Sequence, residues 1–205
     1  MSYFHFDDDA TAVVNEEKLG TNGKRLCELK RLHLNIRWGV VISTNLYESY
    51  LRWNDNRNVR TNELINTINR IVKELKNCPE SECSVFPAKL FSLSASTSTN
   101  SSSKSIPHNN AILGMNDETF SIVSEQYGIV YALNMYANFL MRFGVLFLGV
   151  DKSEYYRILN KFKSHTDKTS NSWRDIVNSF KEVRPVPNSL FDQVIDILII
   201  AFNCL

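Results

Sequence analysis

The stretch that most constrains the fold runs from Phe143 to His165, FGVLFLGVDKSEYYRILNKFKSH, because an apolar run turns at once into an amphipathic pattern. The residues from 143 to 150 are almost all apolar and are too few for a separate helix, which favours a short buried strand. Asp151 or Ser153 can then accept the free N–H groups of a helix that begins there. The helix has an apolar side with Tyr156, Leu159 and Phe162, and a basic side with Lys152, Arg157, Lys161 and Lys163. This segment therefore predicts one strand-helix unit of an α/β fold.

Composition limits the class of protein. With 205 residues, 43% of them hydrophobic, the chain can bury the core of one domain and a small appendage. The formal net charge of +1 argues against a uniformly polyanion-binding surface but leaves a local basic patch open. The four cysteines lack the paired spacing of a metal site, which indicates reduced thiols in the cytosol or nucleus. We expect neither a secretion signal nor a membrane span, since no basic-apolar leader opens the chain and its apolar stretches are interrupted by polar residues.

The first half of the chain predicts two strand regions around one helix. Residues 1–30 read as a partly disordered polar lead-in, whose acidic residues 7–9 form a solvated patch rather than a metal site. The β-branched and aromatic residues of 32–53 predict one or two strands. A helix capped by Thr61 follows and ends near Asn77. Residues 83–93 predict a further strand, in which Pro87 requires an edge position or a bulge.

The second half begins with a Ser/Thr/Asn-rich tract, which predicts a flexible insertion over residues 94–116. A helix from 117–119 to 141 is apolar on nearly all sides, so it is buried within the protein or against a partner. Two more helices, at 172–182 and from 188 onward, are joined by the hairpin VRPVP. The alternation of strands and helices makes a sheet with helices on its faces the expected α/β architecture.

The search for chemistry finds no catalytic constellation. The seven glycines form no phosphate-binding fingerprint, and the four histidines do not pair at helical spacing. A two-metal nuclease needs carboxylates on its central strands with a lysine nearby. Glu48 and Asp55 lie near the first strand region, but the second carries only Lys89 and no acid. We therefore expect no enzyme activity, no metal and no cofactor; a divergent nuclease using Glu48 or Asp55 is a separate hypothesis.

The order of these elements resembles a known family. GVVISTNLYESYLRW, NELINTINRIVKEL, SVFPAKLFSL, ALNMYANFLM and FGVLFLGVDKSEYYRILNKFKSH together resemble the central domain of the XPF/ERCC structure-specific endonucleases, in particular their catalytically silent subunit. The segment SWRDIVNSFKEVRPVPNSLFDQVIDILIIAF resembles the helix-hairpin-helix that follows that domain. The resemblance implies an inactive nuclease-like sheet with helices on both faces in residues 31–166 and a degenerate or partial helix-hairpin-helix in 167–205.

Two departures from the family pattern bear on function. The Gly-Asp and Glu-Arg-Lys-x-x-x-Asp metal motif of active members is absent, which implies no nuclease activity. The hairpin VRPVPN replaces the Gly-apolar-Gly turn that grips phosphate, and its prolines lack N–H donors. Tight DNA binding by this chain alone is therefore not expected.

The resemblance implies a noncatalytic subunit that pairs with an XPF-like protein in the nucleus, on chromosomes, and binds branched DNA recombination intermediates. Small size and a Ser/Asn-rich composition narrow the likeness to the small sporulation-specific subunits of the meiotic ZMM crossover group. The implied DNA contacts are Arg174, Lys181 and Arg184, extended by Lys161 and Lys163. The implied partner surface comprises Leu190, Phe191, Val194, Ile195, Leu198 and Phe202.

Each of these assignments has an alternative interpretation. The apolar residues of the last helix equally fit an intramolecular core, and Lys181 and Arg184 also fit solvated charges that complement the carbonyl end of a helix. The alternative function is an α/β scaffold subunit of a chromatin or kinetochore assembly that makes no contact with nucleic acid.

Overall fold

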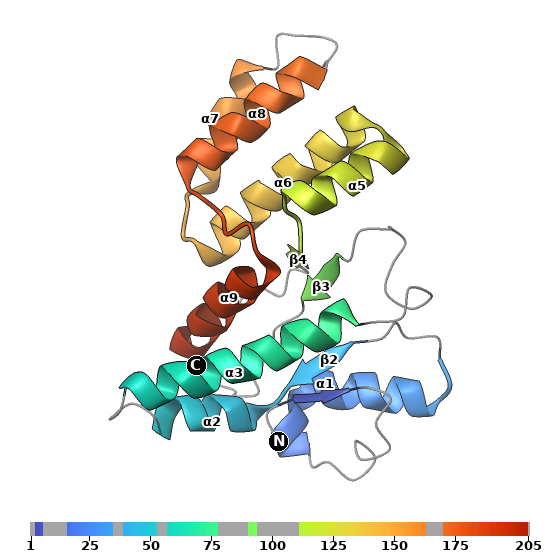
Figure 1. The fold of residues 1–205 in the computed structure, drawn as a ribbon, viewed down its shortest axis with the longest axis vertical. Helices are drawn as coiled ribbons and strands as arrows, with labels where there is room; N and C mark the ends of the chain where they lie inside the picture. Colours follow the sequence, from blue (N-terminus) through green and yellow to red (C-terminus); the bar gives the residue numbers. More distant parts are fainter. Residues whose placement is uncertain are drawn as a thin grey trace. The chain divides into compact units, whose positions relative to one another are not determined.

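The computed structural model of this chain describes residues 3–5, 16–34, 39–52, 57–77, 90–93, 111–162 and 170–204. These residues form eight α-helices and four strands of three residues each, so the described part of the chain is mostly helical (Figure 1). The contacts group the chain into two units. Unit 1 comprises residues 1–83, 95–108 and 198–205, and unit 2 comprises residues 84–94 and 109–197.

Unit 1 begins with an antiparallel strand pair, β1 (Tyr3–His5) and β2 (Val40–Ile42), against which α1 (Glu16–Arg31) packs. Leu19 and Cys27 of α1 are buried against Val41 of β2. Residues 16–30 of the predicted lead-in instead belong to α1, where buried Leu19 and Cys27, on either side of a kink at Gly20, hold the helix against the strand.

Unit 1 also contains α2 (Thr44–Arg52) and α3 (Arg57–Lys76). The helix predicted from Thr61 to Asn77 corresponds to α3, which begins four residues earlier. Its apolar face is buried through Leu64, Ile68, Ile71 and Val72. In α2, Tyr47 and Tyr50 pack on Phe202 with ring centroids 5.6 and 4.9 Å apart. The residues that were expected to be strand after position 43 therefore form a helix with an aromatic face.

Unit 2 is organised around one long apolar helix. It contains the antiparallel pair β3 (Phe91–Leu93) and β4 (Ala111–Leu113), followed by α5 (Asp117–Tyr127), α6 (Ile129–Phe147), α7 (Lys152–Lys161) and α8 (Ser170–Val183). The last helix, α9 (Leu190–Cys204), begins in unit 2 and ends in unit 1. The central helix α6 packs against α5, α8 and β4, and α8 packs against α7 as well (Figure 1).

The nuclease-like sheet expected from the sequence is wrong for the described residues. Their strands form only two separate two-stranded pairs, and no central sheet carries helices on both faces. The α/β fold of the alternative scaffold subunit is wrong on the same ground, while its role in a chromatin or kinetochore assembly stays a prediction. Residues 111–116, assigned to the flexible insertion, instead form β4 and the turn that caps α5.

Residues 143–147 of the strand expected at 143–150 are part of a helix. α6 continues to Phe147, and Phe139, Phe143 and Phe147 stack four residues apart with centroids separated by 5.6 and 5.1 Å. The apolar run seemed too short for a helix because the sequence pattern ended the preceding apolar helix at residue 141, whereas the structure joins the two in one helix. Asp151 does cap the following helix, accepting a 2.8 Å hydrogen bond from the N–H of Ser153.

The helix predicted from 117–119 to 141 is two helices. Gly128 separates α5 from α6 and has a φ of 88°, a conformation that glycine adopts without steric cost. The beginning of α5 matches the prediction: Asn116 and Thr119 cap it reciprocally, with two side-chain to backbone hydrogen bonds of 2.8 Å.

α6 is long and apolar enough, by length and composition alone, to cross a membrane, and the expectation that the chain has no membrane span stays a prediction. A core helix of a soluble domain passes the same test. In unit 2, α6 buries eight side chains or backbone positions while it packs against α5, α8 and β4, which is the environment of a core helix. The buried positions are Ala132, Leu133, Tyr136, Ala137, Phe139, Leu140, Phe143 and Gly144.

Candidate nucleic-acid interface

The connector between α8 and α9, residues 184–189, contains most of the VRPVPN turn that the sequence assigns to a degenerate or partial helix-hairpin-helix. It is held by Gln193, whose side chain is fully buried. The Oε1 atom of Gln193 accepts a 2.9 Å hydrogen bond from the N–H of Gly114. Its Nε2 atom donates to the carbonyl oxygens of Met115 and Pro187, at 3.0 and 2.8 Å. One amide thus ties the connector to the turn before α5 and satisfies three backbone groups.

Two further contacts fix the same connector. The side chain of Asn188 accepts a 3.2 Å hydrogen bond from the N–H of Asp117. Ser189 caps α9, since its hydroxyl donates to Asp192 Oδ2 at 2.7 Å and accepts from the N–H of Asp192 at 3.0 Å. The connector is therefore a defined turn, although it lacks the glycines of a phosphate-gripping hairpin.

Lys181, one of the expected DNA contacts, lies in a cluster with Asp117 and Tyr136. Its Nζ atom is 3.2 Å from Asp117 Oδ1 and 4.7 Å from the centroid of the Tyr136 ring, and the Tyr136 hydroxyl donates to the same carboxylate oxygen at 3.2 Å. Burial disfavours the ammonium, but the contacts with Tyr136 and Asp117 outweigh it and raise the pKa of Lys181. Burial is also the main cause of the raised pKa of Tyr136. Lys181 thus already has an anionic partner within the chain.

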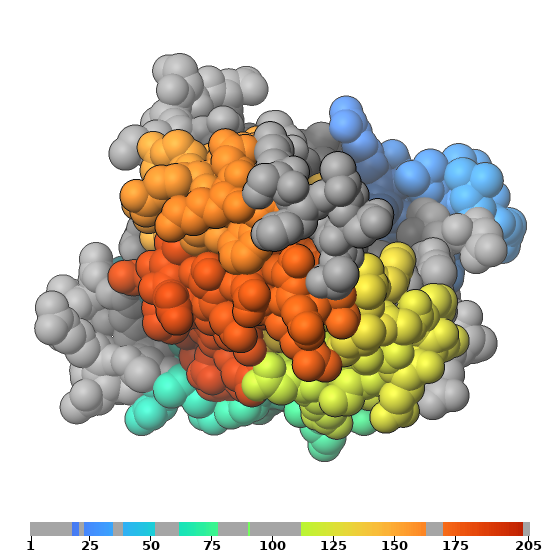
Figure 2. All heavy atoms as spheres, turned by 90° about the horizontal axis from the view of Figure 1, so that it is seen from above, coloured from blue at the N-terminus to red at the C-terminus, as the bar shows by residue number. Residues whose placement is uncertain are grey.

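The other expected DNA contacts are distributed over α7 and α8. Arg174 lies on the exposed side of α8 and Arg184 is exposed just beyond its end. Lys161 is exposed in the last turn of α7, and Lys163 lies outside the described residues. Neither Arg174 nor Arg184 forms an ion pair with another described side chain. In unit 2, the surfaces of α7 and α8 adjoin on one face (Figure 2).

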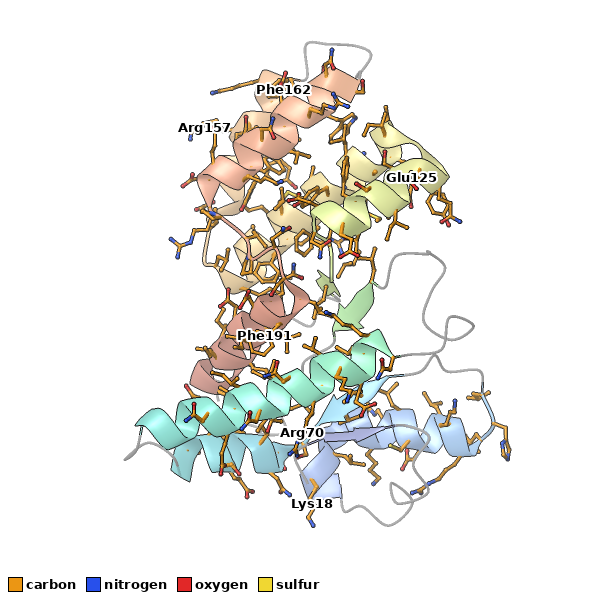
Figure 3. All side chains as sticks on the ribbon, viewed as in Figure 1. Lys18, Arg70, Glu125, Arg157, Phe162 and Phe191 are labelled. Carbon is orange, nitrogen blue, oxygen red and sulfur yellow. The ribbon has the colours of Figure 1, made fainter. Side chains whose placement is uncertain are left out.

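Sequence reasoning assigned no site to the other exposed residues of α7. Lys152, Tyr156 and Arg157 lie with Lys161 on its solvent-facing side, and Figure 3 shows Arg157 extending away from the neighbouring helices. Lys152 Nζ lies 5.2 Å from the centroid of the Tyr156 ring, which is 43% exposed. The basic side of this helix was visible in the sequence. However, Tyr156 was counted among the apolar residues, while the structure buries Tyr155 instead.

The expected partner surface on α9 is mostly covered by the chain itself. Leu190, Val194, Leu198 and Phe202, spaced at intervals of four residues, are buried. The two remaining residues, Phe191 and Ile195, are half-buried. The intramolecular interpretation thus accounts for four of the six residues.

A different apolar patch is exposed where α5 meets α6. Tyr127, Val130 and Tyr131 are 39, 43 and 46% exposed, and the two tyrosine rings contact each other with centroids 5.5 Å apart. These residues belong to the apolar segment 120–141 that the sequence assigned either to the core or to a partner. In the structure, some side chains of this segment are buried toward α8, and these three are exposed to solvent.

Among the described residues, no group of three or more His, Cys, Asp or Glu side chains is arranged to hold a metal ion. Glu48, considered for a nuclease site, is exposed on α2, and Asp55 lies outside the described residues.

No family model matches this chain. Weak matches link it to chloroplastic pyruvate, phosphate dikinases of two plants. The dikinase of Flaveria bidentis is 26% identical over 174 residues, and that of Flaveria pringlei is 26% identical over 180 residues. Each match covers 80% of this chain but only 18% of the dikinase. The chain thus spans less than a fifth of these relatives, and neither match shows a family.

Proposed function

We propose that this chain is a noncatalytic subunit of a heterodimer with an XPF-like protein, and that the heterodimer binds branched DNA during meiotic crossover formation. The proposal takes its partner and process from the sequence resemblance and does not include a nuclease-like sheet. The observation that carries it is that Arg174 of α8 and Arg184 of the fixed connector 184–189 are exposed and form no ion pair with another described side chain.

Arginines that are not neutralised by a neighbour are suited to phosphate contact, since they can release the counterions of DNA. Lys181 is less suited because Asp117 already compensates its charge. We therefore assign Arg174 and Arg184 as the main phosphate contacts of α8 and its connector, and Lys181 as a residue that joins α8 to α5 and α6.

The exposed patch of Tyr127, Val130 and Tyr131 supports the proposal that the chain binds a partner protein. Exposed aromatic residues that contact each other are typical of the core of a protein interface. This patch is a better candidate for the heterodimer surface than α9, whose apolar residues are mostly buried in the chain.

The test is to purify the full chain from meiotic cells, identify any stoichiometric partner, and measure binding of the complex to a four-way DNA junction. We expect an XPF-like partner, and we expect Arg174→Glu with Arg184→Glu to weaken junction binding at least tenfold. As a matched control, Arg70→Glu with Lys73→Glu places the same charge change on the exposed side of α3 and should leave binding unchanged; Arg70 is labelled in Figure 3. Absence of such a partner, or equal effects of both charge reversals, would overturn the proposal.

A further inference from the structure

The solvent-facing side of α7 combines cations with an exposed aromatic ring. Lys152, Arg157 and Lys161 are exposed there together with Tyr156, and Ser153 and Asn160 complete the face with polar groups. Arg157 and Lys161 are four residues apart and therefore lie on neighbouring turns. The helix has hydrogen-bond donors and a ring along one side over ten residues, about 15 Å.

We propose that this face of α7 binds single-stranded DNA, with Tyr156 stacking on a base and Lys152, Arg157 and Lys161 contacting phosphates. The inference rests on the proposed function in taking DNA as the ligand and adds a site that was not part of it. Proteins that hold single strands combine a basic track with exposed aromatic rings in this way. A duplex offers no free base face to a side chain on its surface, so the exposed ring favours a single strand.

The arrangement of charges on α7 supports an anionic ligand. Lys152 Nζ lies over the Tyr156 ring, 5.2 Å from its centroid, so the cation occupies one face of the ring and a base would stack on the opposite face. Arg157 and Lys161 form no ion pair with another described side chain. Glu154 is the acidic residue on the exposed part of this helix, and Asp151 is engaged in capping its first turn.

The interior side of α7 explains why this face can be altered without unfolding the helix. Tyr155 and Ile158 are buried, and Tyr155 contacts Phe180 of α8 with ring centroids 4.8 Å apart. Substitution of the exposed residues leaves these contacts in place, and far-ultraviolet circular dichroism of each variant would verify it.

The experiment measures binding of the full chain, without a partner, to a fluorescein-labelled oligothymidylate by fluorescence anisotropy over a series of salt concentrations. We expect Arg157→Glu with Lys161→Glu to weaken binding at least tenfold. The slope of log K on log salt should fall in magnitude by about 1.4, since each contact to a single strand contributes about 0.7. Tyr156→Ala should weaken binding about tenfold, within the range known for loss of one stacked base, whereas Tyr156→Phe should retain it.

The control Arg70→Glu with Lys73→Glu should not change the affinity, and a duplex of the same length should bind more weakly than the single strand. The inference is overturned if the parent chain does not bind oligothymidylate, if the α7 variants bind as the parent does, or if polyglutamate competes as well as DNA. The assay contains no partner protein and leaves Arg174 and Arg184 intact. Failure here therefore differs from failure of the heterodimer proposal, which the partner identification and the α8 variants test.

Discussion

The contact between α6 and α7 at Gly144 leads to a quantitative prediction about stability. A Cβ atom added at Gly144 would overlap the hydroxyl oxygen of Tyr155 and would lie 2.8 Å from its Cζ and 3.1 Å from its Cε2. Tyr155 is fully buried, and its ring packs edge-on against Phe180. The ring therefore has little room to move when Gly144→Ala introduces the methyl group.

Two effects of Gly144→Ala oppose each other. Alanine favours the helix by about 1 kcal/mol relative to glycine. Overpacking of a buried site costs about 1–3 kcal/mol, and an overlap with a fixed ring lies at the upper end of that range. We expect Gly144→Ala to lower the free energy of unfolding by about 2 kcal/mol, because the overlap outweighs the helix preference.

Removal of the Tyr155 hydroxyl allows the energetic cost of the overlap to be measured separately. It is buried and has no hydrogen-bond partner among the described residues, so Tyr155→Phe should leave stability unchanged or raise it by about 1 kcal/mol. In the Tyr155→Phe background, Gly144→Ala should cost about 1 kcal/mol less than in the parent, because the closest overlap is gone.

Urea unfolding of the full chain, followed by circular dichroism, would measure the four members of this cycle. Asn138→Ala is the control, since it also introduces alanine into α6 but at an exposed position. It should change stability by less than about 1 kcal/mol. A neutral or stabilising Gly144→Ala, or a coupling of zero with Tyr155→Phe, would refute the close packing of α7 on α6.

Three further predictions concern hydrogen bonds. Gln193→Leu should destabilise the protein by about 2–4 kcal/mol in urea unfolding, since it leaves buried backbone groups at Gly114 and Met115 without partners; the exposed Gln126→Leu should change stability little. Asn116→Ala should cost about 1 kcal/mol and speed amide hydrogen exchange in the first turn of α5, while unchanged exchange there would contradict the capping. The Ser153 N–H lowers the pKa of Asp151 below its ordinary 3.8. The hydrogen bond to the ionised carboxylate therefore stabilises the folded protein above pH 3.8, and this stabilisation is lost as the pH falls through the lowered pKa. Asp151→Asn should therefore flatten the acid limb of the curve of melting temperature against pH, and an unchanged limb would refute the contribution.

The helices with local signals could be predicted from sequence. The apolar period of α3, α8 and α9 placed all three. Asp151 was one of two predicted caps of α7, with Ser153, because its oxygen and the free N–H groups of the helix lie within three residues of each other. Such signals depend on neighbouring residues and do not require the rest of the fold.

The interpretation of the apolar run at 143–150 could not be settled in this way. A short apolar run fits a buried strand or a buried helix equally well by periodicity. Its helical state depends on α5, α8 and β4, which surround α6 and bury its apolar sides. That error, together with the strand expected where α2 forms, produced the expected sheet and, through the order of elements, the expected nuclease-like fold.

The candidate site shows the same division between sequence and tertiary structure. The sequence by itself determined which residues carry positive charge and which helices carry them, since charge and helical period are local properties. Only the tertiary structure decided that Lys181 is paired with Asp117, 64 residues away, and that Gln193 holds the connector through Gly114 and Met115. Contacts between residues so distant in the chain depend on how the helices pack, and no local pattern of residue types records that packing.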